Sequence, residues 1–220
     1  MTKTVDRKII STLFFMMVVA SCEIFNAMTV LADNPKARRY PTDAEIKKAM
    51  PEFRRQVQYW EKGRSRFQRT QAEINELDAF TKAWAGRNPN SLPFLGDWSS
   101  SETFTTIYPS TVKDKVCVVT SGGGTSGGNG ISGNTYVDLN IGKVINNQIR
   151  TSDLAIIFRQ GNYLGTLFVY GKDNVGVGAY LPPKRPPKLS EIHLIEDQSK
   201  SSQEKLLREF TQAGCKDSIP

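Results

Sequence analysis

The chain has 220 residues, and its content of 39% hydrophobic and 23% charged residues is typical of a globular protein. A single histidine excludes a metal site built from several imidazoles. The net charge of +7 comes entirely from residues 36–69, where eleven Lys and Arg accompany four Asp and Glu. This segment is therefore expected to meet an anionic surface or partner.

The N-terminus has the layout of a secretory signal. Lys3, Arg7 and Lys8 precede the uncharged run IISTLFFMMVVA at residues 9–20, which is short for a helix that spans a bilayer. Residues 1–21 are therefore predicted to be a signal peptide, and the protein is predicted to be exported to the cell envelope.

The end of the apolar run and the two residues after it, Val19-Ala20-Ser21-Cys22, resemble the lipobox of bacterial lipoproteins. The resemblance implies cleavage before Cys22 and a diacylglycerol on its thiol, which would anchor the protein to a membrane. Ordinary secretion, with cleavage after Ala20 or Ala32, is one alternative and would leave the protein periplasmic or secreted. An uncleaved anchor is another. Residues 22–41 are predicted to be a tether, because the stretch DNPKARRYP at 33–41 is polar and basic and contains two prolines.

Residues 42–86 are predicted to be a basic amphipathic helical segment. Thr42-Asp43-Ala44-Glu45 fits a capping box, and apolar residues then recur at helical spacing. Pro51 favours the first turn of a second helix, and Gly63 favours a break near residues 63–65. The basic side chains beside this stripe are Lys47, Lys48, Arg54, Arg55, Lys62, Arg64, Arg66 and Arg69.

Two interpretations of this segment stay open. In the first, the helix binds an anionic bilayer or an acidic protein partner through these basic side chains. Alternatively, it packs its apolar stripe on the next part of the protein and turns a solvated basic face outward.

Residues 92–181 lose the helical period and alternate short β-rich runs with turn residues. The strands are predicted near 94–99, 103–108, 115–120, 134–139, 142–149, 154–159, 163–170 and 175–181. Seven or eight short strands with tight turns indicate an antiparallel β-barrel or sandwich. No helix-length segment separates them, which argues against a parallel sheet. Residues 182–188 are predicted to be a Pro-rich link. Residues 189–220 are predicted to be a C-terminal helix, over 189–213, followed by a tail. The predicted fold class is therefore α+β.

The stretch VCVVTSGGGTSGGNG contains a G-x-G-x-x-G pattern at Gly122, Gly124 and Gly127. A dinucleotide site needs a helix directly after such glycines, because the helix N-terminus binds the pyrophosphate. The residues after Gly130 favour a strand instead. A hairpin loop between antiparallel strands is therefore predicted, and no cofactor is expected.

Cysteine counting fits export. Once Cys22 is lipidated or removed, Cys117 and Cys215 remain and are predicted to form a disulfide in an oxidising compartment. The alternative is two unconnected buried thiols. No catalytic residue is assigned, because His193 is the only histidine and no G-x-S-x-G motif accompanies it.

Enzymatic activity and nucleic-acid binding are both disfavoured. Paired carboxylates could still serve a hydrolase, and the candidates in the β region are Asp97, Glu102, Asp138, Asp153 and Asp173. The basic segment has no nucleic-acid-binding motif around it.

Gly96-Asp97-Trp98 opens the β region with a G-x-W pattern that is similar to the start of the lipocalin-like and avidin-like barrels, the calycins. The resemblance implies that Trp98 closes one end of a small barrel. Such a barrel is filled by its own side chains or holds one small apolar ligand, with Trp98, Tyr163 and Phe168 near the cavity. The leading hypothesis is a non-enzymatic binding or scaffold protein at a membrane surface, the ligand-binding barrel is the first alternative, and a carboxylate-based hydrolase is the second.

Overall fold

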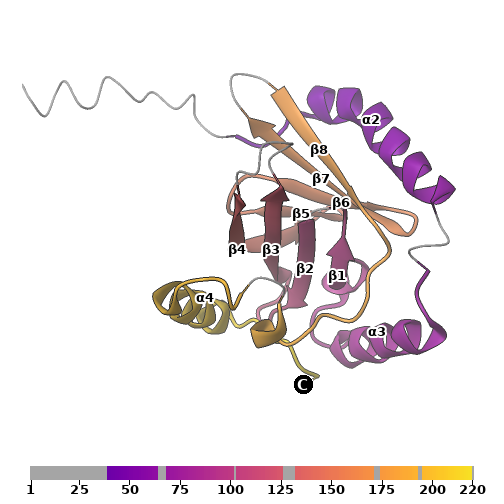
Figure 1. Ribbon diagram of the computed structural model, residues 1–220. Helices are drawn as coiled ribbons and strands as arrows, with labels where there is room; N and C mark the ends of the chain where they lie inside the picture. Colours follow the sequence, from indigo (N-terminus) through magenta and orange to yellow (C-terminus); the bar gives the residue numbers. More distant parts are fainter. Residues whose placement is uncertain are drawn as a thin grey trace, which may run out of the picture. The chain divides into compact units, whose positions relative to one another are not determined.

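The computed structural model describes residues 39–63, 68–101, 103–125, 132–170, 174–192 and 195–219, within a compact unit that begins at Arg39. Its centre is an eight-stranded antiparallel sheet curled into a half-barrel (Figure 1). Every strand pairs with its neighbour in sequence, in the order β1 to β8. The predicted α+β class and the antiparallel sheet of short strands are thus confirmed.

Helical elements precede and follow the sheet. They are α2 (Asp43–Lys62), α3 (Gln71–Trp84), the 3-10 helices η2 (Pro89–Phe94) and η3 (Leu189–Glu191), and α4 (Lys200–Gln212). The strands are β1 (Gly96–Ser99), β2 (Thr103–Pro109), β3 (Lys115–Thr125), β4 (Ser132–Ile145), β5 (Gln148–Thr151), β6 (Ile156–Gln160), β7 (Tyr163–Tyr170) and β8 (Asn174–Tyr180).

The concave face of the sheet carries the main core. Side chains from all eight strands or their ends form one buried cluster there, which includes Trp98, Val118 and Leu164. Phe80 and Trp84 of α3 join the same cluster and fill one end of it. We call this the closed end of the concave face. Because side chains alternate along each strand, the neighbouring residues point to the convex face.

Two helices cover the convex face. Ala49 of α2 packs with Ile156 and Leu167 of β6 and β7, and α2 lies along β7 and β8 (Figure 1). Leu206 and Phe210 of α4 belong to a second convex cluster, built on β2, β3 and β4. Both helices are therefore held by burial of one apolar stripe, which is the main source of helix stability in proteins.

The expected break at Pro51 is wrong, because Pro51 lies inside the continuous helix α2. Proline leaves the carbonyl of Lys47 without its helical partner, but both residues are exposed, so water can bond that carbonyl. Ala49 and Phe53, on either side, are buried against the sheet and hold the helix through this point. The helical segment does end at Gly63, the cap residue of α2.

The strand predicted over 142–149 is two strands. β4 continues to Ile145, and β5 starts at Gln148 after a two-residue turn. Asn146 and Asn147 both have positive φ, 50° and 58°, as this tight hairpin turn requires and asparagine tolerates.

The C-terminal helix begins later than predicted. After η3, the chain packs Ile192 and Ile195 into the convex cluster on β2–β4. The helix α4 starts after Ser199, whose side chain accepts a hydrogen bond from the Ser202 N–H. A serine cap thus sets the helix start.

The glycine-rich stretch belongs to a hairpin, as predicted, but its first glycines lie in strand β3. Gly122 pairs with Tyr136 of β4, and the antiparallel pairing extends to Thr125 and Ser132. Residues 126–131, including Gly127, lie outside the described residues. The next element of the described chain is β4, so the glycines lack the helix that a dinucleotide site requires.

The chain after β8 returns to the first strand. The Leu181 N–H donates to the Ser99 carbonyl at 2.8 Å, and Asp97 and Lys184 exchange two backbone hydrogen bonds of 2.9 and 3.1 Å. The expected Pro-rich link therefore begins as a short antiparallel partner of β1.

Candidate functional site

The helix α2 presents the site that the sequence predicts. Thr42 and Glu45 form a reciprocal capping box that fixes its first turn. Its apolar stripe packs on the sheet, where the rings of Phe53 and Phe158 meet edge to face at 4.9 Å between centroids. This is the packing interpretation of the stripe, so the aromatic residue Phe53 is core, and the opposite side of α2 faces solvent.

The solvent side of α2 gathers five of the eight predicted basic residues. We define the basic face of α2 as these exposed residues: Lys47, Lys48, Arg54, Arg55 and Lys62. Arg69 follows the helix and is half-buried, donating to the Pro183 carbonyl at 2.8 Å. Arg64 and Arg66 lie outside the described residues.

One of the five charges is compensated. Arg55 makes a bidentate pair with Glu52, at 2.6 and 2.7 Å. These hydrogen bonds from Arg55, with one from Gln56, lower the pKa of Glu52 to about 2. The pair is exposed and contributes little to stability, but it leaves Lys47, Lys48, Arg54 and Lys62 as the charges of the basic face.

A groove of about 690 Å³ lies between α2 and the turn that joins β6 to β7. Phe53, Val57 and Trp60 of α2 form one apolar wall. Tyr163 and Leu181 contribute from the other side. The two arginines at the groove are Arg54 and Arg69. The groove is therefore amphipathic, with two guanidinium groups beside an apolar wall.

The other predicted ligand residues lie elsewhere. Trp98 is fully buried at the closed end, where its indole Nε1–H donates to the Phe94 carbonyl at 2.7 Å. Arg159 lies over the indole ring at 5.9 Å and donates to the Pro93 carbonyl, so it caps this end. The closed end is filled by side chains. A small-ligand barrel thus stays a prediction, and its ligand would have to contact another part of the concave face.

Phe168 lies at the opposite end of the concave face and is 44% exposed. The strand pairings put Tyr136, Asp138 and Tyr170 on the same face. Of these, the sequence singled out only Asp138, as a candidate carboxylate, and neither tyrosine. The alternation of side chains within β4 and β7 was the available signal. It could not be used, because the pairing of the strands was not known.

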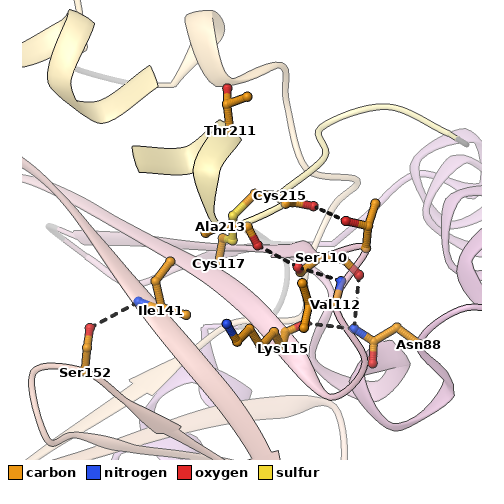
Figure 2. The surroundings of a disulfide bond; sticks show 12 residues. Asn88, Ser110, Val112, Lys115, Cys117, Ile141, Ser152, Thr211, Ala213 and Cys215 are labelled. Atoms are coloured by element: carbon orange, nitrogen blue, oxygen red, sulfur yellow. Dashed lines mark hydrogen bonds between the residues drawn. A yellow bond between two sulfur atoms is a disulfide. The ribbon is translucent and has the colours of Figure 1, made fainter. Parts of the chain in front are cut away.

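The disulfide between Cys117 and Cys215 is present, as predicted (Figure 2). Cys117 is on β3 and faces the convex cluster, and Cys215 follows α4. Hydrogen bonds hold the same tail: Ser110 donates to the Ala213 carbonyl at 2.8 Å, and the Lys216 N–H donates to the Pro109 carbonyl at 3.0 Å. The tail is thus attached both covalently and through the edge of β2.

The described candidate carboxylates are not brought together. The strand pairings place Asp97 on the convex face and Asp138 on the concave face, while Asp153 accepts a hydrogen bond from Thr151 near the turn after β5. Among the described residues, no three acidic, His or Cys side chains form a metal-binding group. Glu102, Asp173 and His193 lie outside the described residues.

Asp97 has a pH-dependent role in stability. Burial raises the pKa of its carboxyl, although a hydrogen bond from Thr106 and the charge of Lys184 oppose this. Because the Asp97 carboxyl has a higher pKa in the folded than in the unfolded protein, its contribution to stability is fully present at pH values below the unfolded-state pKa. This contribution is lost as the pH rises through the folded-state pKa. Asparagine in its place keeps the oxygen acceptor for Thr106 without the charge.

We therefore expect the natural protein to lose stability relative to Asp97→Asn as the pH rises from about 3 to about 7. Urea unfolding of both proteins across this range measures the difference. A difference that stays constant, or rises with pH, would show that the buried carboxyl is not the titrating group. Asp197→Asn, which removes an exposed carboxylate, is the control for the substitution itself.

Within the residues described, no helix has the length and apolarity needed to cross a bilayer. Comparison with protein-family models, with curated proteins and with solved structures gave no match to this chain.

Proposed function

We propose that this protein is an exported, non-enzymatic binding protein of the cell envelope that is held at a membrane surface. Its N-terminal segment supplies the anchor through Cys22, and the basic face of α2 binds anionic lipid headgroups. The observation that carries the proposal is the position of Lys47, Lys48, Arg54 and Lys62. They lie on the side of α2 that is opposite to its packed stripe, where one flat surface can meet all four.

A lipid surface fits this face better than an acidic protein does. Tyr59 is 69% exposed on α2, and Trp60 lies beside the adjacent groove. Aromatic side chains of this kind are favoured at the boundary between headgroups and acyl chains. Arg54 is at the groove and on the basic face, so a headgroup there would have cationic and aromatic neighbours.

The expected affinity explains why an anchor is needed. Each basic residue near an anionic surface contributes about 1 kcal/mol, so four contribute roughly 4 kcal/mol and give weak, reversible binding. Stable attachment takes two signals, such as acyl chains and a basic patch. The lipid on Cys22 would keep the protein at the membrane, and α2 would set its orientation.

Vesicle co-sedimentation of the full chain tests the proposal. Vesicles with phosphatidylglycerol are compared with vesicles of phosphatidylcholine alone, so that the N-terminal segment contributes to both. We expect stronger binding to the anionic vesicles, decreasing as salt is raised. Glutamate at Lys47, Lys48, Arg54 and Lys62 is expected to abolish the difference between the two vesicle types.

The matched control reverses four exposed basic residues in and after α4: Lys200, Lys205, Arg208 and Lys216. It changes the net charge by the same amount and should retain the preference for anionic vesicles. Equal losses in both variants would mean that net charge alone acts. If the natural protein shows no preference for anionic vesicles, the lipid proposal fails and an acidic protein becomes the remaining partner for α2.

A further inference from the structure

The groove beside α2 adjoins a second, smaller pocket. This pocket has a volume of about 190 Å³ and is lined by residues of α3, of the segment around η2 and of the β6–β7 turn. Arg69, Ile74 and Asn162 line both cavities, so the two form one continuous depression. The groove has the apolar wall described above, whereas the pocket holds two arginines, Arg69 and Arg159.

Backbone carbonyls fix the position of both arginines. Arg159 donates from Nε to the Gly161 carbonyl at 2.8 Å and from Nη1 to the Pro93 carbonyl at 2.9 Å. Arg69 donates from Nη1 to the Pro183 carbonyl at 2.8 Å. A guanidinium group has five N–H donors, and these bonds use two donors of Arg159 and one of Arg69. Both side chains are therefore held in place with N–H groups left to bond a ligand.

The pocket carries a net positive charge. Among the described residues, no carboxylate forms a salt bridge with Arg69 or Arg159. Burial lowers the pKa of Arg159, and the charge of Arg69 lowers it further, so the two guanidinium groups lie within electrostatic reach of each other. Asp78 also lines the pocket, from an exposed position on α3. Two cations and one acid together favour a ligand with a single negative charge.

The apolar wall of the adjoining groove is only partly buried. Phe53 and Leu181 are buried, but Val57, Trp60 and Tyr163 are half-buried. Concave sites with apolar walls and a few polar groups are typical of small-molecule binding, and a volume of about 690 Å³ lies in the usual range for such sites. An apolar chain attached to an anion in the small pocket would have this wall beside it.

We infer that the groove and the small pocket together bind a fatty acid. Its carboxylate lies between Arg69 and Arg159, and its acyl chain lies along Val57, Trp60 and Tyr163. Guanidinium and carboxylate groups form short, charge-assisted hydrogen bonds, often two at once. Each CH₂ group that the wall removes from water strengthens binding by roughly 4-fold. The two cavities thus match the two parts of the ligand.

This site is distinct from the lipid surface proposed above. Of the basic face of α2, Arg54 lines the groove, while Lys47, Lys48 and Lys62 line neither cavity. A fatty acid in the site is a single bound molecule and needs no bilayer. The two functions can therefore be measured separately, one with a dissolved ligand and the other with vesicles.

Calorimetric titration of the full chain with decanoate tests the site in the absence of vesicles. Decyltrimethylammonium has the same chain with the opposite charge, and acetate has the carboxylate without the chain. We expect decanoate to bind with a dissociation constant below about 1 mM and decyltrimethylammonium to bind at least about 10-fold more weakly. Acetate is expected not to bind at about 10 mM, because it lacks the apolar contribution.

Two substitutions locate the ligand, each with a matched control. Arg69→Gln and Trp60→Ala are each expected to weaken decanoate binding about 5- to 30-fold. Arg208→Gln removes an exposed guanidinium on α4, and Tyr59→Ala removes an exposed ring next to Trp60. Neither control residue lines the groove or the small pocket, so both variants should bind decanoate as the natural protein does.

Three results would each overturn the fatty-acid site. The first is no binding of decanoate, and the second is equal binding of decanoate and decyltrimethylammonium. The third is unchanged decanoate binding in Arg69→Gln and Trp60→Ala, both verified as folded by circular dichroism. The triple variant with glutamate at Lys47, Lys48 and Lys62 should bind decanoate within about 2-fold of the natural protein in about 0.15 M salt. A loss as large as that in Arg69→Gln would mean that overall charge acts, and would also overturn the site.

Discussion

Replacement of both Cys117 and Cys215 by alanine is expected to lower the free energy of unfolding by about 3–5 kcal/mol. The two cysteines are separated by 98 residues, and closing a loop of this length restricts the unfolded chain strongly. The folded state should change little, because Ser110 and Lys216 also hold the tail. Denaturant unfolding of the two proteins measures the loss.

Reducing agent supplies the control for this prediction. It should lower the stability of the natural protein to that of the double variant and leave the double variant unchanged. A loss below about 1 kcal/mol would mean that the unfolded chain is already compact around this pair. An exported protein in an oxidising compartment would keep the full contribution of the bond.

Trp98→Ala is expected to destabilise the protein by about 3–5 kcal/mol, because it removes a large, fully buried side chain and leaves a cavity. Its indole joins the rings of Phe94 and Trp84 in one cluster and lies under Arg159. The substitution would therefore also remove the ring below the guanidinium that caps the closed end.

Trp98→Phe separates the ring from its hydrogen bond. It keeps an aromatic ring but loses the bond to the Phe94 carbonyl, so a smaller loss of about 1–2 kcal/mol is expected. Chemical unfolding of both variants gives the two values. If alanine and phenylalanine destabilise the protein equally, the hydrogen bond rather than packing would account for the role of Trp98.

The elements that the sequence predicts well are those with a strong local signal. The capping box at Thr42 and Glu45 marks the start of α2, and the alternating strand at residues 163–170 is found with the same bounds as β7. The cysteine pair follows from the cysteine count together with the predicted export. In each case the deciding information lies within a few residues or in composition.

Tertiary packing decides the features that the sequence does not predict. Pro51 stays helical because its neighbours are buried on the sheet. This burial cannot be inferred from the residues next to Pro51 in the sequence. The predicted residues Arg54, Arg69 and Tyr163 meet in one groove, whereas Trp98 and Phe168 separate to the two ends of the concave face. Their distances depend on strand pairing and on the curl of the sheet, which require the whole fold.

The return of residues 181–184 to β1 has a consequence for association between copies. A sheet edge with free backbone groups is a template on which another chain can add a strand. Residues 181–184 occupy the edge of β1, and the Gln56 side chain of α2 donates to the Val177 carbonyl of β8 at 3.3 Å. Both edges of the sheet are thus partly covered by the protein's own chain. This covering should oppose edge-to-edge aggregation between copies of the protein.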